Sequence, residues 1–151
     1  MRSLEPRRFV CNRLATAFLE PLWEAAHLSF YTIWTDGTIR DNAVAVLNCT
    51  MGDLLIALVV LTAALVVAGH PGWPIRRWTP VAALTLAIGV AYTVYSEHLN
   101  VDVRRSWTYS DLMPRLALLG TGLSPIVQWI VVPAGALVWA RRRALHSGRM
   151  K

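Results

Sequence analysis

The run 43-AVAVLNCTMGDLLIALVVLTAALVVA-68 decides the fold class of this chain. Asp53 is its single charged residue. A helix needs about 20 consecutive, mostly apolar residues to cross the hydrocarbon core of a bilayer. The run therefore predicts a membrane-spanning helix over residues 43–68.

Composition and two further runs support this prediction. The chain has 151 residues, of which 55% are hydrophobic and 16% are charged, and its mean hydropathy is +0.42. Soluble domains hold about a quarter charged residues. Thr79–Leu99 has no charge before Glu97, and the run at about 115–140 has none after its first residue, although it contains Pro125 and Pro133. Both runs predict spans, and the length fits one domain over residues 1–151.

A fourth segment, at about residues 9–34, is more polar than the others. An amphipathic helix on the membrane surface is one interpretation of it. We favour a span because Glu20, Glu24, His27 and Tyr31 are spaced 4, 3 and 4 residues apart and so share one helical face. The sequence thus predicts an all-α integral membrane protein, built as a four-helix bundle.

The basic residues predict the orientation of the four spans. Eleven of the 15 lie in three short segments that flank apolar runs, and these segments fall on one side of the membrane. The other side holds four arginines, offset by four aspartates. Because the side richer in Lys and Arg is cytoplasmic, we expect both termini inside the cell. The net charge of +6 is therefore a topology signal and does not indicate nucleic-acid binding.

Polar residues on all four spans are predicted to gather in the outer half of the membrane. Ionisable groups at such depth cost about 2.5–3.5 kcal/mol each and usually face the protein interior. We therefore expect an internal cavity that opens outward. Its predicted ligand-binding residues are Glu24, His27, Tyr31, Cys49, Asp53, Tyr92, Glu97 and Gln128.

The stretch 92-YTVYSEHLN-100 ends the third span, and Glu97 within it has two interpretations. It is either a carboxylate at the mouth of the cavity or an interfacial residue that reaches water. We expect His98 at the interface and Asn100 as a cap. After the following polar loop, Met113-Pro114 predicts the first turn of the fourth span.

Three chemistries fit the polar cluster. In the first, His27, Cys49 and Asp53 hold a transition metal such as zinc. In the second, Glu24, Asp53 and His27 carry out acid–base chemistry on a lipid-like substrate. In the third, the polar residues only bond helices to one another, in an accessory subunit of a membrane complex or in a homo-oligomer.

Binding of a small ligand or metal ion is the leading hypothesis, with the bilayer as the surrounding partner. The sequence identifies no catalytic residue, so it leaves open whether the protein is an enzyme. Cys11 and Cys49 fall at opposite membrane faces in this topology, so we expect no disulfide between them.

Several motifs resemble one family of proteins. The stretches YSEHLN, RRSWTYSDLMP and GTGLSPIVQWIVVP, together with WEAAHLSFYTIW and LNCTMGDLLIA, are similar to those of small bacterial four-span membrane proteins. The similarity spans most of the chain. It implies a bacterial inner-membrane setting and supplies no activity.

Overall fold

The computed structural model describes residues 25–148, and this part of the chain is helical and without strands. Residues 25–28 are helical and are followed by a short helix, α2 (Ile33–Asp36), and by three long ones. The long helices are α3 (Ile39–Ala68), α4 (Trp78–Glu97) and α5 (Leu123–Gly148), and a π-helical segment, η1 (His98–Val103), extends α4. By length and composition, three helices could each cross a membrane: α3, α4 with η1, and α5. The predicted all-α class is confirmed for the described residues, as are three helices at the expected places.

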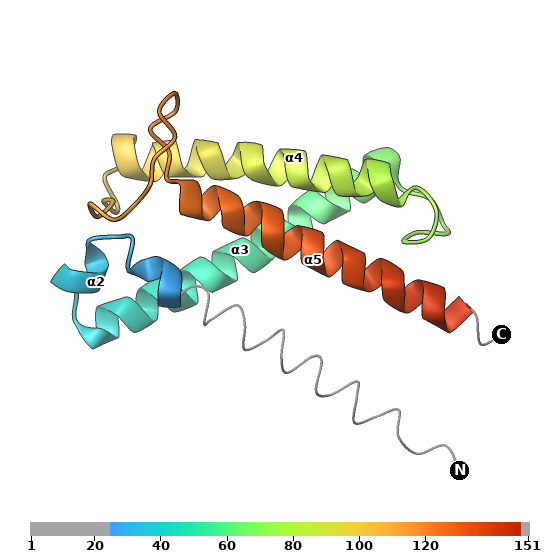
Figure 1. Ribbon diagram of the computed structural model, residues 1–151, viewed down its shortest axis with the longest axis horizontal. Coiled ribbons are helices and arrows are strands. Elements are labelled where there is room, and N and C mark those ends of the chain that lie inside the picture. Colours follow the sequence, from blue (N-terminus) through green and yellow to red (C-terminus); the bar gives the residue numbers. More distant parts are fainter. Residues whose placement is uncertain (1–24, 149–151) are drawn as a thin grey trace, which may run out of the picture.

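Helix α4 is the central element, because α3 and α5 both pack against it (Figure 1). One stripe of α4 is buried at every fourth residue: Val81, Thr85, Gly89, Thr93 and Glu97. Residues four apart lie on one face of a helix. The hydroxyls of Thr85 and Thr93 donate to the carbonyl oxygens of Val81 and Gly89, at 2.8 and 3.0 Å, so the stripe can be buried without losing hydrogen bonds.

Most of the outer surface of α3 is apolar, and it would meet water if the protein were soluble. Only 17% of its most apolar stretch is buried. Its exposed large side chains are Ile39, Val44, Leu47, Met51, Leu54, Leu55, Leu58, Val59, Val66 and Val67. A continuous apolar surface of this kind marks contact with lipid or with another apolar partner.

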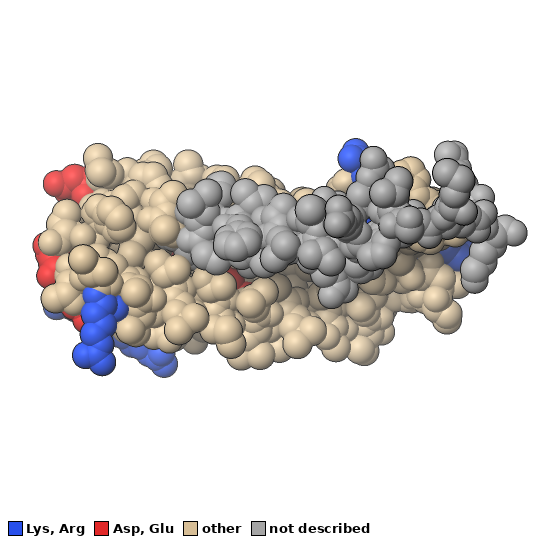
Figure 2. Space-filling view, turned by 90° about the horizontal axis from the view of Figure 1, so that it is seen from below, with Lys and Arg blue, Asp and Glu red and all other residues tan. Residues whose placement is uncertain are grey.

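Charged side chains gather at the two ends of the helices (Figure 2). One end, where α3 begins and α4 ends, carries arginines and aspartates together. The opposite end carries Arg76, Arg77 and the run 141–143, with no acidic residue in the described segments there. The chain therefore separates its charges along the direction of the helices.

Several helix bounds differ from the predicted ones. Helix α5 begins at Leu123, because residues 114–123 form a hairpin in which Leu116 donates to Thr121 at 2.9 Å and Leu123 donates to Pro114 at 2.7 Å. The predicted start of the fourth span near Met113-Pro114 is therefore wrong.

The first predicted span also ends early. Its helical residues stop at Leu28, and a turn follows at residues 29–30. One continuous helix to residue 34 is therefore wrong, and residues 9–24 of that span lie outside the described part. Helix α3 starts at Ile39, four residues before the predicted position, where Thr38 and Asp41 form a capping box.

Candidate functional site

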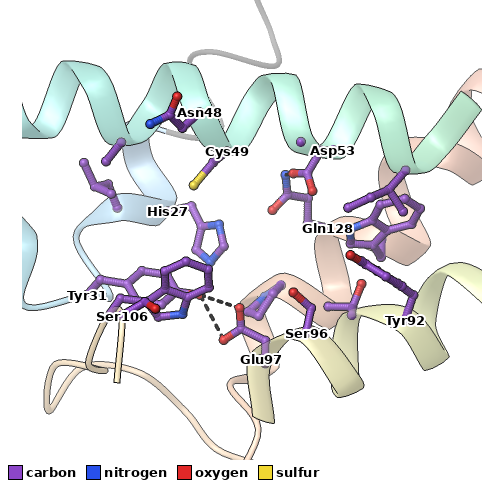
Figure 3. Close-up of a pocket in the computed structure, with 18 of the residues that line it drawn as sticks. His27, Tyr31, Asn48, Cys49, Asp53, Tyr92, Ser96, Glu97, Ser106 and Gln128 are labelled. Atoms are coloured by element: carbon purple, nitrogen blue, oxygen red, sulfur yellow. Dashed lines mark hydrogen bonds between the residues drawn. The ribbon is translucent and has the colours of Figure 1, made fainter. Parts of the chain in front are cut away.

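A pocket of about 310 Å³ lies between the long helices, near the end where α3 begins and α4 ends (Figure 3). Its walls come from α3, α4 and α5, from residues 27–33 and from the loop at residues 106–107. Helix α3 contributes more of the described lining residues than α4 or α5: Ala45, Asn48, Cys49, Gly52, Asp53 and Ile56. The alternating spacing of three and one places these six residues on one helical face.

Glu97 is the most buried acidic residue of this site. Only 7% of its surface is exposed, although it occupies the last position of α4. The Tyr31 hydroxyl donates to its two carboxylate oxygens, at 3.3 and 3.2 Å, and the Tyr109 hydroxyl donates to Oε2. Figure 3 shows the carboxylate turned toward Tyr31. Burial of the carboxylate is thus accompanied by two hydroxyl donors.

Backbone pairing brings the two tyrosines together. Thr32 N donates to Thr108 O at 3.0 Å, and Ser110 N donates to Phe30 O at 2.9 Å, which forms an antiparallel bridge between Tyr31 and Tyr109. The two rings lie with their centroids 5.5 Å apart. The loop after η1 therefore returns to the N-terminal segment and completes the surroundings of Glu97.

Tyr109 links this loop to the start of α5. Its hydroxyl accepts a hydrogen bond from Gly122 N at 3.0 Å, and the Arg115 guanidinium lies 5.0 Å from its ring centroid. Burial raises the pKa of the Tyr109 phenol, and its hydrogen bond to Glu97 raises that pKa further. The phenol therefore stays protonated at neutral pH and can donate to Glu97.

His27 presents a buried polar atom to the pocket. The residue is 8% exposed, and its Nε2 atom has no hydrogen-bond partner among the described residues. Its ring packs against Tyr31, with the centroids 5.3 Å apart. In Figure 3 the ring points into the pocket between Cys49 and Tyr31. Buried polar atoms are normally hydrogen-bonded, so one that faces a cavity identifies a place for a ligand group or water.

Polar side chains of α3 and α5 meet in another part of the pocket lining. The Gln128 side-chain amide donates to Asp53 Oδ2 at 3.1 Å. Cys49 lies one helical turn from Asp53 on the same face of α3. This part of the lining therefore offers a carboxylate, an amide and a thiol to the pocket.

The structure gathers the predicted ligand-binding residues that it describes. Seven of them line this one pocket: His27, Tyr31, Cys49, Asp53, Tyr92, Glu97 and Gln128. Glu24 lies outside the described residues. Whether the seven bind a ligand stays a prediction.

The polar residues of the stretch 92–100 lie in different surroundings. Glu97 belongs to the pocket, whereas the His98 side chain is exposed and pairs with Asp102 at 2.8 Å. The Asn100 amide donates to Ser96 O at 2.9 Å while the helix continues as η1, so Asn100 does not end the helix. Short π-helical segments are rare, and they are frequently found at functional sites.

The predicted metal site receives no support from the structure. Among residues 25–148, no three His, Cys, Asp or Glu side chains lie close enough together to hold a metal ion. The predicted ligands His27, Cys49 and Asp53 line the same pocket but do not form such a group.

Sequence reasoning missed the contribution of the loop. Trp107 lines the pocket, and Tyr109 is 5% exposed and bonded to Glu97, although neither was among the predicted site residues. Ser96, Ser106 and Trp129 also line the pocket without having been predicted. The nearest sequence signal was the density of aromatic and hydroxyl residues in 106-SWTYS-110.

Comparison of the chain with protein-family models, with curated proteins and with solved structures finds no match. The residues of the pocket are therefore the basis of the proposed function.

Proposed function

We propose that this chain is a membrane protein that binds a small amphiphilic molecule in the pocket between α3, α4 and α5. One observation carries the proposal: a buried His27 Nε2 atom without a described partner faces the same cavity as the buried Glu97 carboxylate. Convergent buried polar groups in a mostly apolar pocket are the usual mark of a ligand site.

The size and the walls of the pocket support an organic ligand. A volume of about 310 Å³ lies at the lower end of the range of about 300–1,000 Å³ for small-molecule sites. Leu28, Ile33, Ile56 and Trp129 supply apolar surface, and Tyr31 and Glu97 are hydrogen-bonded to each other in the same lining. A molecule with an apolar body and one polar end matches this arrangement.

The membrane setting is part of the proposal. Four spans with both termini in the cytoplasm would place the arginine-only end inside and the pocket in the outer half of a bacterial inner membrane. The first predicted span, at about residues 9–34, would then end at Leu28, where the described helical residues stop. Association with a larger membrane complex or with further copies of the chain stays a prediction.

The experiment is to identify what the pocket retains during purification. A Cβ added at Gly52 meets no heavy atom within 4 Å, so Gly52→Leu should fill the pocket without displacing the backbone. Gly135 on α5 has equally open surroundings and does not line the pocket, so Gly135→Leu is the matched control. Each protein is purified in lipid nanodiscs, and its small molecules are extracted and compared by mass spectrometry.

We expect one compound that the unaltered chain and Gly135→Leu retain and that Gly52→Leu loses. Identical extracts from all three proteins would contradict ligand binding in this pocket.

Acid–base chemistry on the bound molecule is a second candidate. It is favoured by one observation, the presence of an imidazole and a carboxyl group, from His27 and Glu97, in the same pocket. Such groups transfer protons when they lie within reach of a substrate. The retained compound would be incubated with the unaltered chain and with His27→Gln. A change in its mass or isotope content that only the unaltered chain produces would support catalysis, and no change would leave binding as the function.

A further inference from the structure

The charged side chains of the described pocket lining are both acidic. They are the carboxylates of Asp53 and Glu97. The described Lys and Arg residues do not line the pocket, although the Arg115 guanidinium lies 5.0 Å from the ring centroid of Tyr109, a partner of Glu97. From the described lining, a ligand in the pocket therefore meets two carboxylates and no Lys or Arg side chain.

Glu97 in particular has hydroxyl partners and no cationic one. Tyr31 and Tyr109 donate to it, while the ion pair found among residues 25–148 joins His98 and Asp102 on the exposed side of η1. A buried carboxylate is costly unless a cation or several donors accompany it. The described contacts of Glu97 supply it with hydroxyl donors and with no positive charge.

The aromatic residues of the lining also favour a cationic ligand. Tyr31, Tyr92, Trp107 and Trp129 line the pocket. The faces of such rings attract ammonium groups, and the attraction is stronger where water is excluded. His27 adds a ring nitrogen, Nε2, which can accept a hydrogen bond from an N–H group.

We propose that the pocket binds a protonated lipophilic amine, with Glu97 as its counter-charge and His27 Nε2 as an acceptor for one of its N–H groups. The apolar part of the amine lies against the aromatic walls. This inference rests on the proposed ligand-binding function and specifies the chemical class of the ligand.

Three probes with one carbon skeleton separate charge from shape. They are 4-phenylbutylamine, 4-phenylbutanol and 4-phenylbutyrate, which are cationic, neutral and anionic at neutral pH. Binding to the full chain in a non-ionic detergent is measured by isothermal titration calorimetry, with protein-free micelles as the blank. We expect the amine to bind at least about tenfold more tightly than the alcohol, and the carboxylate to bind most weakly.

Variants assign the effect to Glu97. Glu97→Gln keeps the size of the side chain and an acceptor for the tyrosines, so we expect it to weaken amine binding about tenfold and to change alcohol binding little. Asp102→Asn is the matched control, because it removes one negative charge from the same end of the molecule outside the pocket. Gly52→Leu should weaken binding of the amine and of the alcohol.

The other outcomes overturn the inference in distinguishable ways. Equal binding of amine and alcohol, both lost in Gly52→Leu, would leave the pocket as a ligand site and exclude an amine-specific one. Tightest binding of the carboxylate, or no binding of any probe, would exclude the amine class, and the co-purification experiment would still decide ligand binding independently. Unchanged amine affinity in Glu97→Gln would exclude Glu97 as the counter-charge. If Glu97→Gln does not fold, the order of the three probes on the unaltered chain decides.

Discussion

Tyr109 is the residue on which the surroundings of Glu97 depend. Its hydroxyl accepts from Gly122 N at the entry to α5 and donates to the carboxylate at the end of α4. The same residue pairs with Tyr31 across the short bridge. One hydroxyl therefore connects two long helices and the loop between them.

Tyr109→Phe should lower the free energy of unfolding by about 1–3 kcal/mol, because the substitution leaves the buried Gly122 N–H without its acceptor. Thermal unfolding in detergent, followed by circular dichroism, measures the effect. Tyr95→Phe is the control, since Tyr95 is 60% exposed on α4. Equal losses in the two variants would show that the Tyr109 hydroxyl has no special role.

The sequence predicted the α3 and α4 members of this site better than its loop members. Asp53 on α3 and Glu97 on α4 could be placed at one level because helical spacing and charge-based orientation together fix the depth of a residue in a span. The stripe Gly89, Thr93, Glu97 could also have indicated burial, since it continues at every fourth residue. Tyr109 could not be placed in this way, because a loop has no period and its pairing partner is 78 positions away in the chain.

At the scale of the elements, the contact between α4 and α5 depends on one glycine. A Cβ at Gly89 would lie 2.5 Å from Trp129 Cε3 and 2.8 Å from Cζ3. Both distances are far shorter than ordinary contacts, so the indole occupies the space that a side chain would need. Close approach of helices at small residues is a general means of packing in membranes.

Gly89→Ala should therefore destabilise the protein by about 1–3 kcal/mol through overpacking, and it should disturb the pocket wall that Trp129 forms. Gly135→Ala is the matched control, because a Cβ there meets nothing within 4 Å. The control should be neutral or slightly stabilising, by up to about 1 kcal/mol, since alanine favours a helix over glycine. The readout is again thermal unfolding in detergent. Stability losses of equal size would mean that the Gly89 contact does not limit the approach of the helices.

The elements were predictable where a helix is apolar from end to end. Helices α3 and α4 match the predicted runs closely, because a long apolar stretch in lipid has few alternatives to a helix that satisfies its own backbone. The start of α5 was not predictable in this way. The leucines at 116, 118 and 119 are as apolar as a span, yet they belong to a hairpin with Gly120 at φ 66°. Hydropathy measures composition and does not distinguish these two conformations.

At the scale of the whole molecule, the separation of charge along the helices predicts the orientation. The described part carries five arginines and no acidic residue at one end, namely Arg76, Arg77 and residues 141–143. The other end mixes arginines with aspartates, and the pocket lies toward it. Since arginine-rich segments stay in the cytoplasm, the pocket should lie in the half of the membrane that faces outward. A ligand would then enter from the outer side or from the outer leaflet.

Single cysteines test this orientation. In a chain carrying Cys11→Ser and Cys49→Ser, Arg104→Cys marks the end near the pocket and His70→Cys marks the turn between α3 and α4, and both positions are exposed. Neither substitution weakens the charge asymmetry: Arg104→Cys removes a basic residue from the outer side, and His70→Cys keeps every arginine on the inner side. A membrane-impermeant maleimide applied to whole cells should label position 104 directly and position 70 only after permeabilisation.

The reverse pattern would place the pocket toward the cytoplasm and would contradict the assignment from basic residues. Labelling of both positions in intact cells would mean that α3 and α4 do not end on opposite sides of the membrane. The pattern we expect also bears on the ligand. A pocket on the outer side of a bacterial inner membrane faces away from the negative interior, so a protonated amine would reach Glu97 without first crossing the hydrocarbon core.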